Sequence, residues 1–166
     1  MPEMAFQDYY AENMSHCYGC GRLNQDGLHV RSYWDGDQTV CTFLPRPYHT
    51  AIPGFVYGGL IASVIDCHST GSAAAAAFRA ESRPMDTDPP VRFVTASLHV
   101  DYLRPTPIAG PLQLRSRFKE VGERKVVVLT DLLVEGEICA RGEVVAVRLQ
   151  KTPEVPAPAH NLPGGS

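Results

Sequence analysis

One stretch of the chain, residues 58–78, has the apolar spacing of a long α-helix, and it limits what the rest can form. Apolar side chains recur there at helical intervals, at Leu60, Ile61, Val64 and Ile65. Gly71 is unfavourable inside such a helix, because glycine costs about 1 kcal/mol relative to alanine. An alanine run follows at 73–77, and such small side chains let another backbone approach closely, as a helix clasped by a sheet requires.

The remaining sequence has the alternation and turn signals of β-strands. A hairpin is predicted before the helix, with strands starting at Leu28 and at Thr39 around the turn Asp35–Asp37. Four more strands are predicted after the helix, over 94–103, 112–121, 125–134 and 138–149. The apolar run 126–129 indicates a central strand covered on both faces. About six strands and one helix make an α+β domain with antiparallel meanders, in which the helix crosses one face of the sheet.

The length of 166 residues predicts one domain, since a domain has about 150 residues on average. We expect an N-terminal extension over 1–23 that holds a short helix, a folded domain over 24–150, and a tail over 151–166. The tail contains four prolines and ends in glycines and serine, a composition typical of disorder.

Charge and hydropathy exclude several classes of protein. Fifteen Lys and Arg against 18 Asp and Glu give a net charge of -3, which argues against nucleic-acid binding by bulk electrostatics. No run reaches the roughly 18 apolar residues of a membrane helix. Glu3 and Asp8 stand where a secretory signal would carry positive charge, so a soluble cytoplasmic protein is expected. Five cysteines, an odd number, argue against a disulfide framework.

Two segments resemble a known family. Residues 54–66 (GFVYGGLIASVID) and 100–105 (VDYLRP) are similar to the hotdog-fold acyl-CoA thioesterases of the PaaI-like group, and the resemblance runs from about Asn24 to Leu149. It implies an antiparallel sheet of about six strands wrapped around one long central helix. It also implies hydrolysis of an acyl-CoA thioester to free CoA and a carboxylic acid, by a homodimer or a homotetramer built of two dimers, with no metal or redox cofactor.

The residues themselves fit that chemistry. Hydrolysis needs an activated water and a site that stabilises negative charge on the carbonyl oxygen. Gly58 and Gly59 begin the predicted helix, so their backbone N–H groups have no partner within it, and the helix dipole adds positive charge there. Asp66 is the candidate base or nucleophile, and burial should raise the pKa of its carboxyl group.

The spacing of these residues predicts a site shared between two chains. Gly58 and Asp66 are eight residues apart, about 12 Å along one helix, whereas hydrogen-bond reach is about 3 Å. One chain therefore cannot bring both to the same carbonyl. An antiparallel helix of a second chain would place its Asp66 beside Gly58.

Further residues are candidates for supporting roles. Tyr57 could donate its hydroxyl near the carbonyl, or simply pack. Substrate contacts are predicted for His49, His68, Thr70, Ser97 and Arg104, although His68 also fits a structural, partly buried histidine. Arg104 is the main candidate for the CoA phosphates, with weaker support for Arg79, Arg83 and Arg92.

The cysteines give a weaker signal. His16, Cys17 and Cys20 look like half of a zinc site, but structural zinc has four ligands and no second pair follows. Cys41, Cys67 and Cys139 are scattered and resemble ordinary buried cysteines. The sequence therefore predicts no metal site.

Two other functions remain open. A hotdog hydratase or dehydratase would need an acid–base pair involving a histidine, and His49 could supply one. A non-catalytic acyl-CoA-binding protein is the second alternative, because Tyr57 replaces the histidine of the usual His-Gly-Gly and Ala51 replaces a frequent asparagine. Thiol release, enoyl-thioester hydration and binding without turnover distinguish the three.

Overall fold

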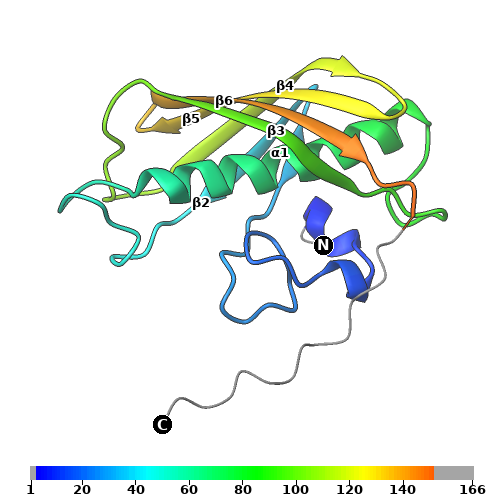
Figure 1. Ribbon diagram of the computed structural model, residues 1–166, viewed down its shortest axis with the longest axis horizontal. Helices are drawn as coiled ribbons and strands as arrows, with labels where there is room; N and C mark the ends of the chain where they lie inside the picture. Colours follow the sequence, from blue (N-terminus) through cyan, green and yellow to red (C-terminus); the bar gives the residue numbers. More distant parts are fainter. Residues whose placement is uncertain (1–2, 152–166) are drawn as a thin grey trace, which may run out of the picture.

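Helix α1, Gly58–Ala80, lies across one face of a six-stranded antiparallel sheet in the computed structural model, which describes residues 3–151 (Figure 1). The strands are β1 (Tyr33–Asp35), β2 (Gln38–Phe43), β3 (Phe93–Tyr102), β4 (Leu112–Val121), β5 (Lys125–Val134) and β6 (Glu137–Arg148). Their order in the sheet is β1-β2-β4-β5-β6-β3. This confirms the predicted α+β hotdog arrangement.

The strands after the helix match their predicted ranges closely. β4 and β5 have the predicted bounds, while β3 and β6 each begin and end one residue earlier. β5 pairs with β4 on one side and β6 on the other. Val126, Val127 and Val128 are all buried, which confirms the prediction of a central strand covered on both faces.

Helix α1 is buried on two opposite sides. On the sheet side, a Cβ added at Gly142 of β6 would lie 2.5 Å from Cγ2 of Ile65. On the other side, a Cβ added at Gly71 would lie 2.5 Å from Nε2 of Gln7. Gln7 belongs to residues 3–23, which we call the N-terminal segment. Every side chain from Ser69 to Phe78 is buried. The helix is unbroken at Gly71, where the absence of a side chain makes room for Gln7.

Residues before β1 cover the side of α1 that faces away from the sheet (Figure 1). They form two short 3-10 helices, Phe6–Tyr9 and Glu12–Met14, in place of the one short helix expected there. The predicted boundary at residue 23 stays a prediction. The predicted tail, 151–166, lies outside the described residues except for its first residue, Lys151. Among residues 3–151, none of the helices has the length and apolar character needed to cross a membrane.

The predicted strand starting at Leu28 is wrong up to Ser32, since regular pairing begins only at Tyr33. The backbone of this stretch bonds to the N-terminal segment and not to a neighbouring strand. The amide of Val30 donates to the Gly19 carbonyl at 2.9 Å, and the Ser32 carbonyl accepts from the Phe6 amide at 2.9 Å.

A buried polar network links the N-terminal segment to α1. The Gln7 side chain accepts from the Ser32 amide at 2.9 Å and donates to the Ser32 hydroxyl at 3.0 Å. That hydroxyl lies 2.8 Å from Nδ1 of His68 on the helix. Burial lowers the pKa of His68 to about 3, so the imidazole is neutral at ordinary pH.

Replacing Gln7 with alanine tests this network. The Gln7→Ala variant leaves the buried Ser32 amide without its acceptor and opens a gap against Gly71. We expect the free energy of unfolding to fall by about 2 to 3 kcal/mol. Urea denaturation measures it. Gln25→Ala at an exposed position is the matched control and should change stability by less than about 0.5 kcal/mol. Equal stability of the two variants would contradict the role given to Gln7.

Candidate functional site

Apart from its exposed last residues, Arg79 and Ala80, the part of α1 that is not fully covered is a short stripe near its start. Gly58, Gly59, Ala62, Ser63 and Asp66 are partly exposed, whereas the intervening positions 60, 61, 64 and 65 are buried. The partly exposed residues recur every three to four positions, so together they follow one face of the helix. Its members before Asp66 are small, which leaves the helix backbone accessible along this face.

Asp66 is the one acidic residue of this stripe, and its side chain is held from β3. Thr95 donates a hydrogen bond from its hydroxyl to Oδ1 of Asp66. Burial raises the pKa of the Asp66 carboxyl above its usual value, and the Thr95 bond only partly opposes this. Cys17 raises that pKa further, whereas the positive charge of Arg92 lowers it. A half-buried carboxylate with one fixed oxygen is suited to accept a proton or to attack a carbonyl.

The start of the helix leaves backbone donors unpaired within the helix. Tyr57 is the N-cap, and its carbonyl accepts from the amides of Leu60 at 3.1 Å and Ile61 at 3.3 Å. The amides of Gly58 and Gly59 precede these first helical bonds, so they have no acceptor inside the helix. Together with the helix dipole they form a site suited to a negatively charged oxygen.

Tyr57 folds back over the first turn of the helix. A Cβ added at Gly59 would lie 2.4 Å from Cε1 of Tyr57, so a side chain at position 59 would displace the ring. The tyrosine is nevertheless exposed to solvent. Its side chain therefore lies beside Gly59 at the start of the helix, and its role near a carbonyl oxygen stays a prediction.

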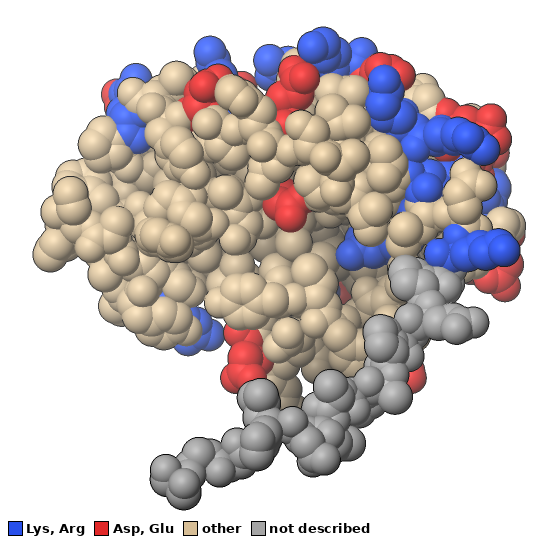
Figure 2. All heavy atoms as spheres, viewed as in Figure 1, with Lys and Arg blue, Asp and Glu red and all other residues tan. Residues whose placement is uncertain are grey.

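A groove of about 470 Å³ opens beside the same helix end. Tyr102 of β3 lines it and donates from its hydroxyl to the Gly58 carbonyl at 2.7 Å. Arg104 lines it too and pairs with Glu137. The other lining residues are mostly apolar: Ala51, Ile52, Phe55, Val56, Ile61, Leu103, Pro105 and Thr106. In Figure 2 the half of the molecule over the start of α1 has few charged side chains.

The structure thus brings Gly58, Tyr57 and Arg104 together at one end of the stripe and puts Asp66 further along it. Because α1 is a continuous helix from Gly58 onward, Asp66 lies about 12 Å from Gly58 along the axis. The carboxylate and the glycine amides of one chain do not meet.

Two residues predicted to contact the substrate, His68 and Thr70, make their hydrogen bonds within the protein. His68 is completely buried and bonded to Ser32, which favours its alternative interpretation as a structural histidine. The Thr70 hydroxyl lies 3.2 Å from the carbonyl oxygen of Asp66 and 3.3 Å from that of Cys67, so its contacts are with its own helix.

Sequence reasoning selected Ser97 on β3, whereas the residue that contacts Asp66 is Thr95. Thr95 pairs with Ala146 and Ser97 pairs with Val145, so one extra residue interrupts the alternation between them. This β-bulge changes the direction of the strand, and Ser97 is exposed on it. The inward alternation that starts at the buried Phe93 points to Thr95 and was the signal available in the sequence.

His49 lies in the loop before α1, without a contact to Asp66 among residues 3–151. Its Nδ1 accepts from the Arg46 amide at 2.9 Å, and its ring packs against Tyr48 and Phe43. Partial burial, and then the charge of Arg46, lower the pKa of the imidazole. His49 borders a second hollow, lined with Tyr18, His29 and Tyr48 among others, which shares no lining residue with the Gly58 groove.

Cys67 is a buried core cysteine, as predicted, but it is not separate from the other cysteines. Its sulfur lies in one cluster with those of Cys17 and Cys20. Hydrogen bonds from Cys20 and Cys67, assisted by the amides of Cys20 and Gly19, lower the pKa of the Cys17 thiol strongly. His16 is exposed, and its backbone carbonyl accepts a hydrogen bond from the side chain of Asn24. Cys67 could not be assigned to the pair from spacing alone, because it is 50 residues from Cys17.

Comparison with known families matches residues 53–140 to the thioesterase superfamily. The chain belongs to this superfamily. The matched region contains the glycine pair, Asp66 and Thr95, and it covers more than half of the chain. The predicted membership of the hotdog-fold thioesterases is confirmed at the level of this superfamily.

Individual relatives agree with this assignment. A thioesterase superfamily protein from Shewanella loihica is 51% identical, with a TM-score of 0.64 over 89% of this chain and 99% of that one. The acyl-coenzyme A thioesterase THEM4 of Bos taurus is 25% identical over 80% of this chain, and that of Xenopus laevis is 29% identical over 79%. The chain spans about half the length of these curated relatives, 55% of each. A putative thioesterase from Ralstonia eutropha, 19% identical with a TM-score of 0.57, shares the fold.

Proposed function

We propose that the protein hydrolyses acyl-CoA thioesters to free CoA and a carboxylic acid. The observation that carries the proposal is the Asp66 carboxylate, half-buried on the one accessible face of α1 and fixed by Thr95. Partial burial of a carboxylate costs free energy, and groups with pKa values raised in this way are common at functional sites. Asp66 shares its helix face with the Gly58 and Gly59 amides, where a substrate carbonyl could bind. The THEM4 relatives, named as acyl-coenzyme A thioesterases, support the choice of substrate.

In the proposed reaction Asp66 acts on the thioester carbonyl in one of two ways. As a base it takes a proton from water, whose oxygen then attacks the carbonyl carbon. As a nucleophile it attacks that carbon itself, and water hydrolyses the resulting anhydride. In both routes the carbon–sulfur bond breaks, CoA leaves as the thiolate, and negative charge develops on the carbonyl oxygen. The amides of Gly58 and Gly59 stabilise this charge. No metal or redox cofactor takes part in these steps.

We further propose that each site uses Asp66 of one chain and the glycine amides of a second chain. Within one chain these groups are about 12 Å apart, so they cannot serve one carbonyl. The accessible stripe of α1 carries only small residues before Asp66, and an antiparallel copy of this helix would fit closely along it. The edge strand β3 adds exposed apolar side chains at Val94 and Leu98 that a second copy would cover. A homodimer, or a homotetramer built of two such dimers, would contain this antiparallel contact between two α1 helices.

The groove beside Gly58 is the proposed entrance for the substrate. Its apolar lining suits an acyl or pantetheine chain, and Arg104 offers a positive charge for a CoA phosphate at the rim. Arg104 is exposed and paired with Glu137, so a phosphate would have to replace that carboxylate. Arg92, one of the weaker candidates, lies away from this groove.

The hydratase alternative loses support from the positions of the histidines. His68 is buried against Ser32, and His49 is engaged with Arg46 in the preceding loop. Within the described part of the chain Asp66 therefore has no imidazole partner. The non-catalytic alternative stays open to the test that follows.

Replacing Asp66 with asparagine removes the proposed base or nucleophile and keeps the size of the side chain. We expect kcat for acyl-CoA hydrolysis to fall by about 10²- to 10⁴-fold. An assay of released CoA thiol measures kcat with aromatic and long-chain acyl-CoAs as substrates. Asp37→Asn, in the exposed hairpin turn, is the matched control. Unchanged hydrolysis by Asp66→Asn would contradict the role of Asp66. Binding by the unmodified protein without thiol release would identify a non-catalytic acyl-CoA-binding protein.

Thr95 offers a finer test of how Asp66 is held. Thr95→Val removes the hydroxyl that donates to Oδ1 and keeps the β-branched shape, whereas Thr95→Ser keeps the hydroxyl. A hydrogen bond to a charged group contributes about 1.5 to 3 kcal/mol, so kcat should fall roughly 10- to 100-fold in the valine variant. The serine variant should stay within about threefold of the original. A loss in both variants, or in neither, would show that the bond does not position the carboxylate.

Complementation between chains tests the shared site. Gly58→Pro removes one proposed donor at the first helical position, where proline is tolerated, and Tyr57 already has the extended backbone that suits a residue before proline. Neither Gly58→Pro nor Asp66→Asn should be active alone. A mixture refolded in equal amounts contains heterodimers with one intact site, so about a quarter of the original activity should return. Heterodimers verified by mass spectrometry that stay inactive would contradict the shared site, as would a fully active monomer.

A further inference from the structure

Three cysteine sulfurs from two distant parts of the chain meet next to Asp66. Cys17 and Cys20 belong to the N-terminal segment, and Cys67 follows Asp66 directly in α1. All three are free thiols, and their sulfurs lie within 4.8 Å of one another. The sulfurs of Cys17 and Cys67 are 3.8 Å apart. Three sulfurs gathered in this way form a set of soft ligands.

The separation matches that of sulfurs around a tetrahedral metal ion. Zinc binds thiolate sulfur at about 2.3 Å, so two sulfurs on one tetrahedral zinc are about 3.8 Å apart. The distance between Cys17 and Cys67 has this length. Cys17 is half-exposed while the other two are buried, so solvent can reach the fourth position.

The backbone around Cys17 and Cys20 forms a tight turn that packs onto Cys67. The Gly21 amide donates to the Cys17 carbonyl at 2.7 Å, and a Cβ at Gly21 would lie 2.5 Å from the Cys17 nitrogen. A Cβ at Gly19 would lie 2.1 Å from the Cys67 sulfur. The backbone amides of Gly19 and Cys20 help to lower the pKa of the Cys17 thiol. Such donors orient a thiolate ligand and stabilise its charge.

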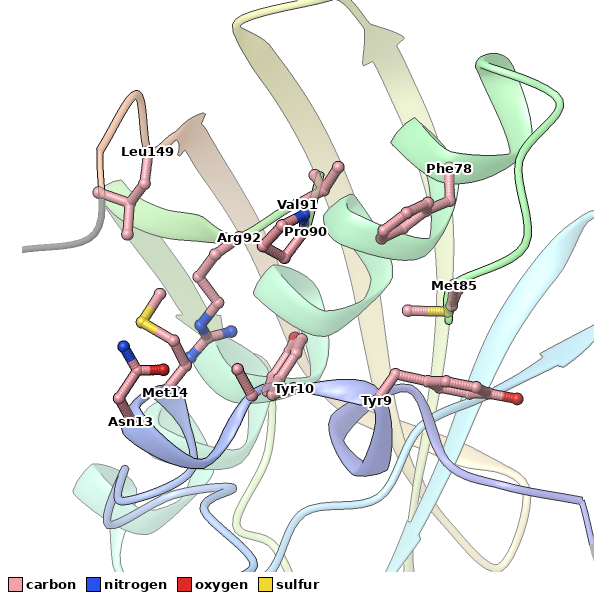
Figure 3. A pocket seen from close by; sticks show the side chains of 11 residues that line it. Tyr9, Tyr10, Asn13, Met14, Phe78, Met85, Pro90, Val91, Arg92 and Leu149 are labelled. Atoms are coloured by element: carbon pink, nitrogen blue, oxygen red, sulfur yellow. The ribbon is translucent and has the colours of Figure 1, made fainter. Parts of the chain in front are cut away.

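A partly buried cation, Arg92, can balance the charge of such a site. Three thiolates around a divalent ion carry a net charge of −1. The Arg92 guanidinium interacts electrostatically with all three cysteines and stacks on Tyr10 at 4.1 Å. Its Nη1 is buried and has no hydrogen-bond partner among residues 3–151. Figure 3 shows the side chain reaching from the residues before β3 toward Tyr10 and Met14 of the N-terminal segment.

We propose that Cys17, Cys20 and Cys67 bind one zinc ion as thiolates and that this ion fastens the N-terminal segment to α1 beside Asp66. Soft thiolates favour zinc over calcium or magnesium. Each thiol releases its proton to solvent when the ion binds, and no redox step takes place. The zinc site is independent of the proposed hydrolysis, because the ion holds backbone elements together and does not contact the substrate.

Cobalt substitution tests the ligand set directly. The full chain is reduced, stripped with a chelator and titrated with Co²⁺, then with Zn²⁺ as competitor. We expect one equivalent per chain, with the thiolate-to-cobalt charge-transfer band and the strong visible bands of tetrahedral cobalt, all removed by zinc. Cys17→Ser, Cys20→Ser and Cys67→Ser should each weaken binding at least about tenfold, whereas Cys139→Ser, another buried cysteine, should not. Retained bands in Cys67→Ser, or no binding to the original chain, would overturn the proposal.

A measurement on the unaltered chain covers the case in which a variant fails to fold. Cys17 is half-exposed, so iodoacetamide should reach it in the stripped protein. Zinc should slow its alkylation roughly tenfold or more, because a metal-bound thiolate is a poor nucleophile. Peptide mass mapping measures this rate, and thermal unfolding should shift upward with zinc. An alkylation rate that zinc leaves unchanged would overturn the proposal, as would a disulfide within the cluster in protein purified without reductant.

Discussion

Burial of α1 on two opposite sides is the constraint on which the rest of the structure depends. The sheet packs against one side, so closely that Gly142 has no room for a side chain beneath Ile65. The N-terminal segment packs against the other side, where Gly71 makes room for Gln7. A helix enclosed in this way needs small residues where a neighbour comes close, which explains the run of alanines from Ala73 to Ala77. Buried polar groups on such a helix are stabilised by hydrogen bonds, and Nδ1 of His68 and the Ser72 hydroxyl make theirs with Ser32 and Thr39.

The same enclosure determines where chemistry can occur. Since sheet and N-terminal segment together cover most of the helix, solvent reaches the stripe from Gly58 to Asp66 and, beyond it, just the exposed last residues Arg79 and Ala80. The amides at the start of the helix and the carboxylate two turns later therefore share one face. Their separation is fixed by helix geometry, and this fixed distance is the physical reason for proposing that two chains build each site.

The N-terminal segment is an integral part of the folded domain and not an appendage to it. It takes over the backbone hydrogen bonds of residues 28–32, which for that reason do not pair as a strand. It also carries Cys17 and Cys20 to the turn of α1 that holds Asp66. The segment that closes the core and the residue proposed for catalysis are thus neighbours, and a metal ion there would connect them.

Much of this protein followed from the sequence by itself: the single helix, the bounds of β4 and β5, and the placing of Gly58, Gly59 and Asp66 on one helix. These features depend on periodicity and turn residues, which act over a few neighbouring positions. Only the tertiary structure decided which residues meet. Thr95 reaches Asp66 from 29 residues away because a β-bulge turns Ser97 aside, His68 meets Ser32 across 36 residues, and Cys67 joins Cys17 across 50. Contacts at such separations depend on how the elements pack, and no local pattern encodes them.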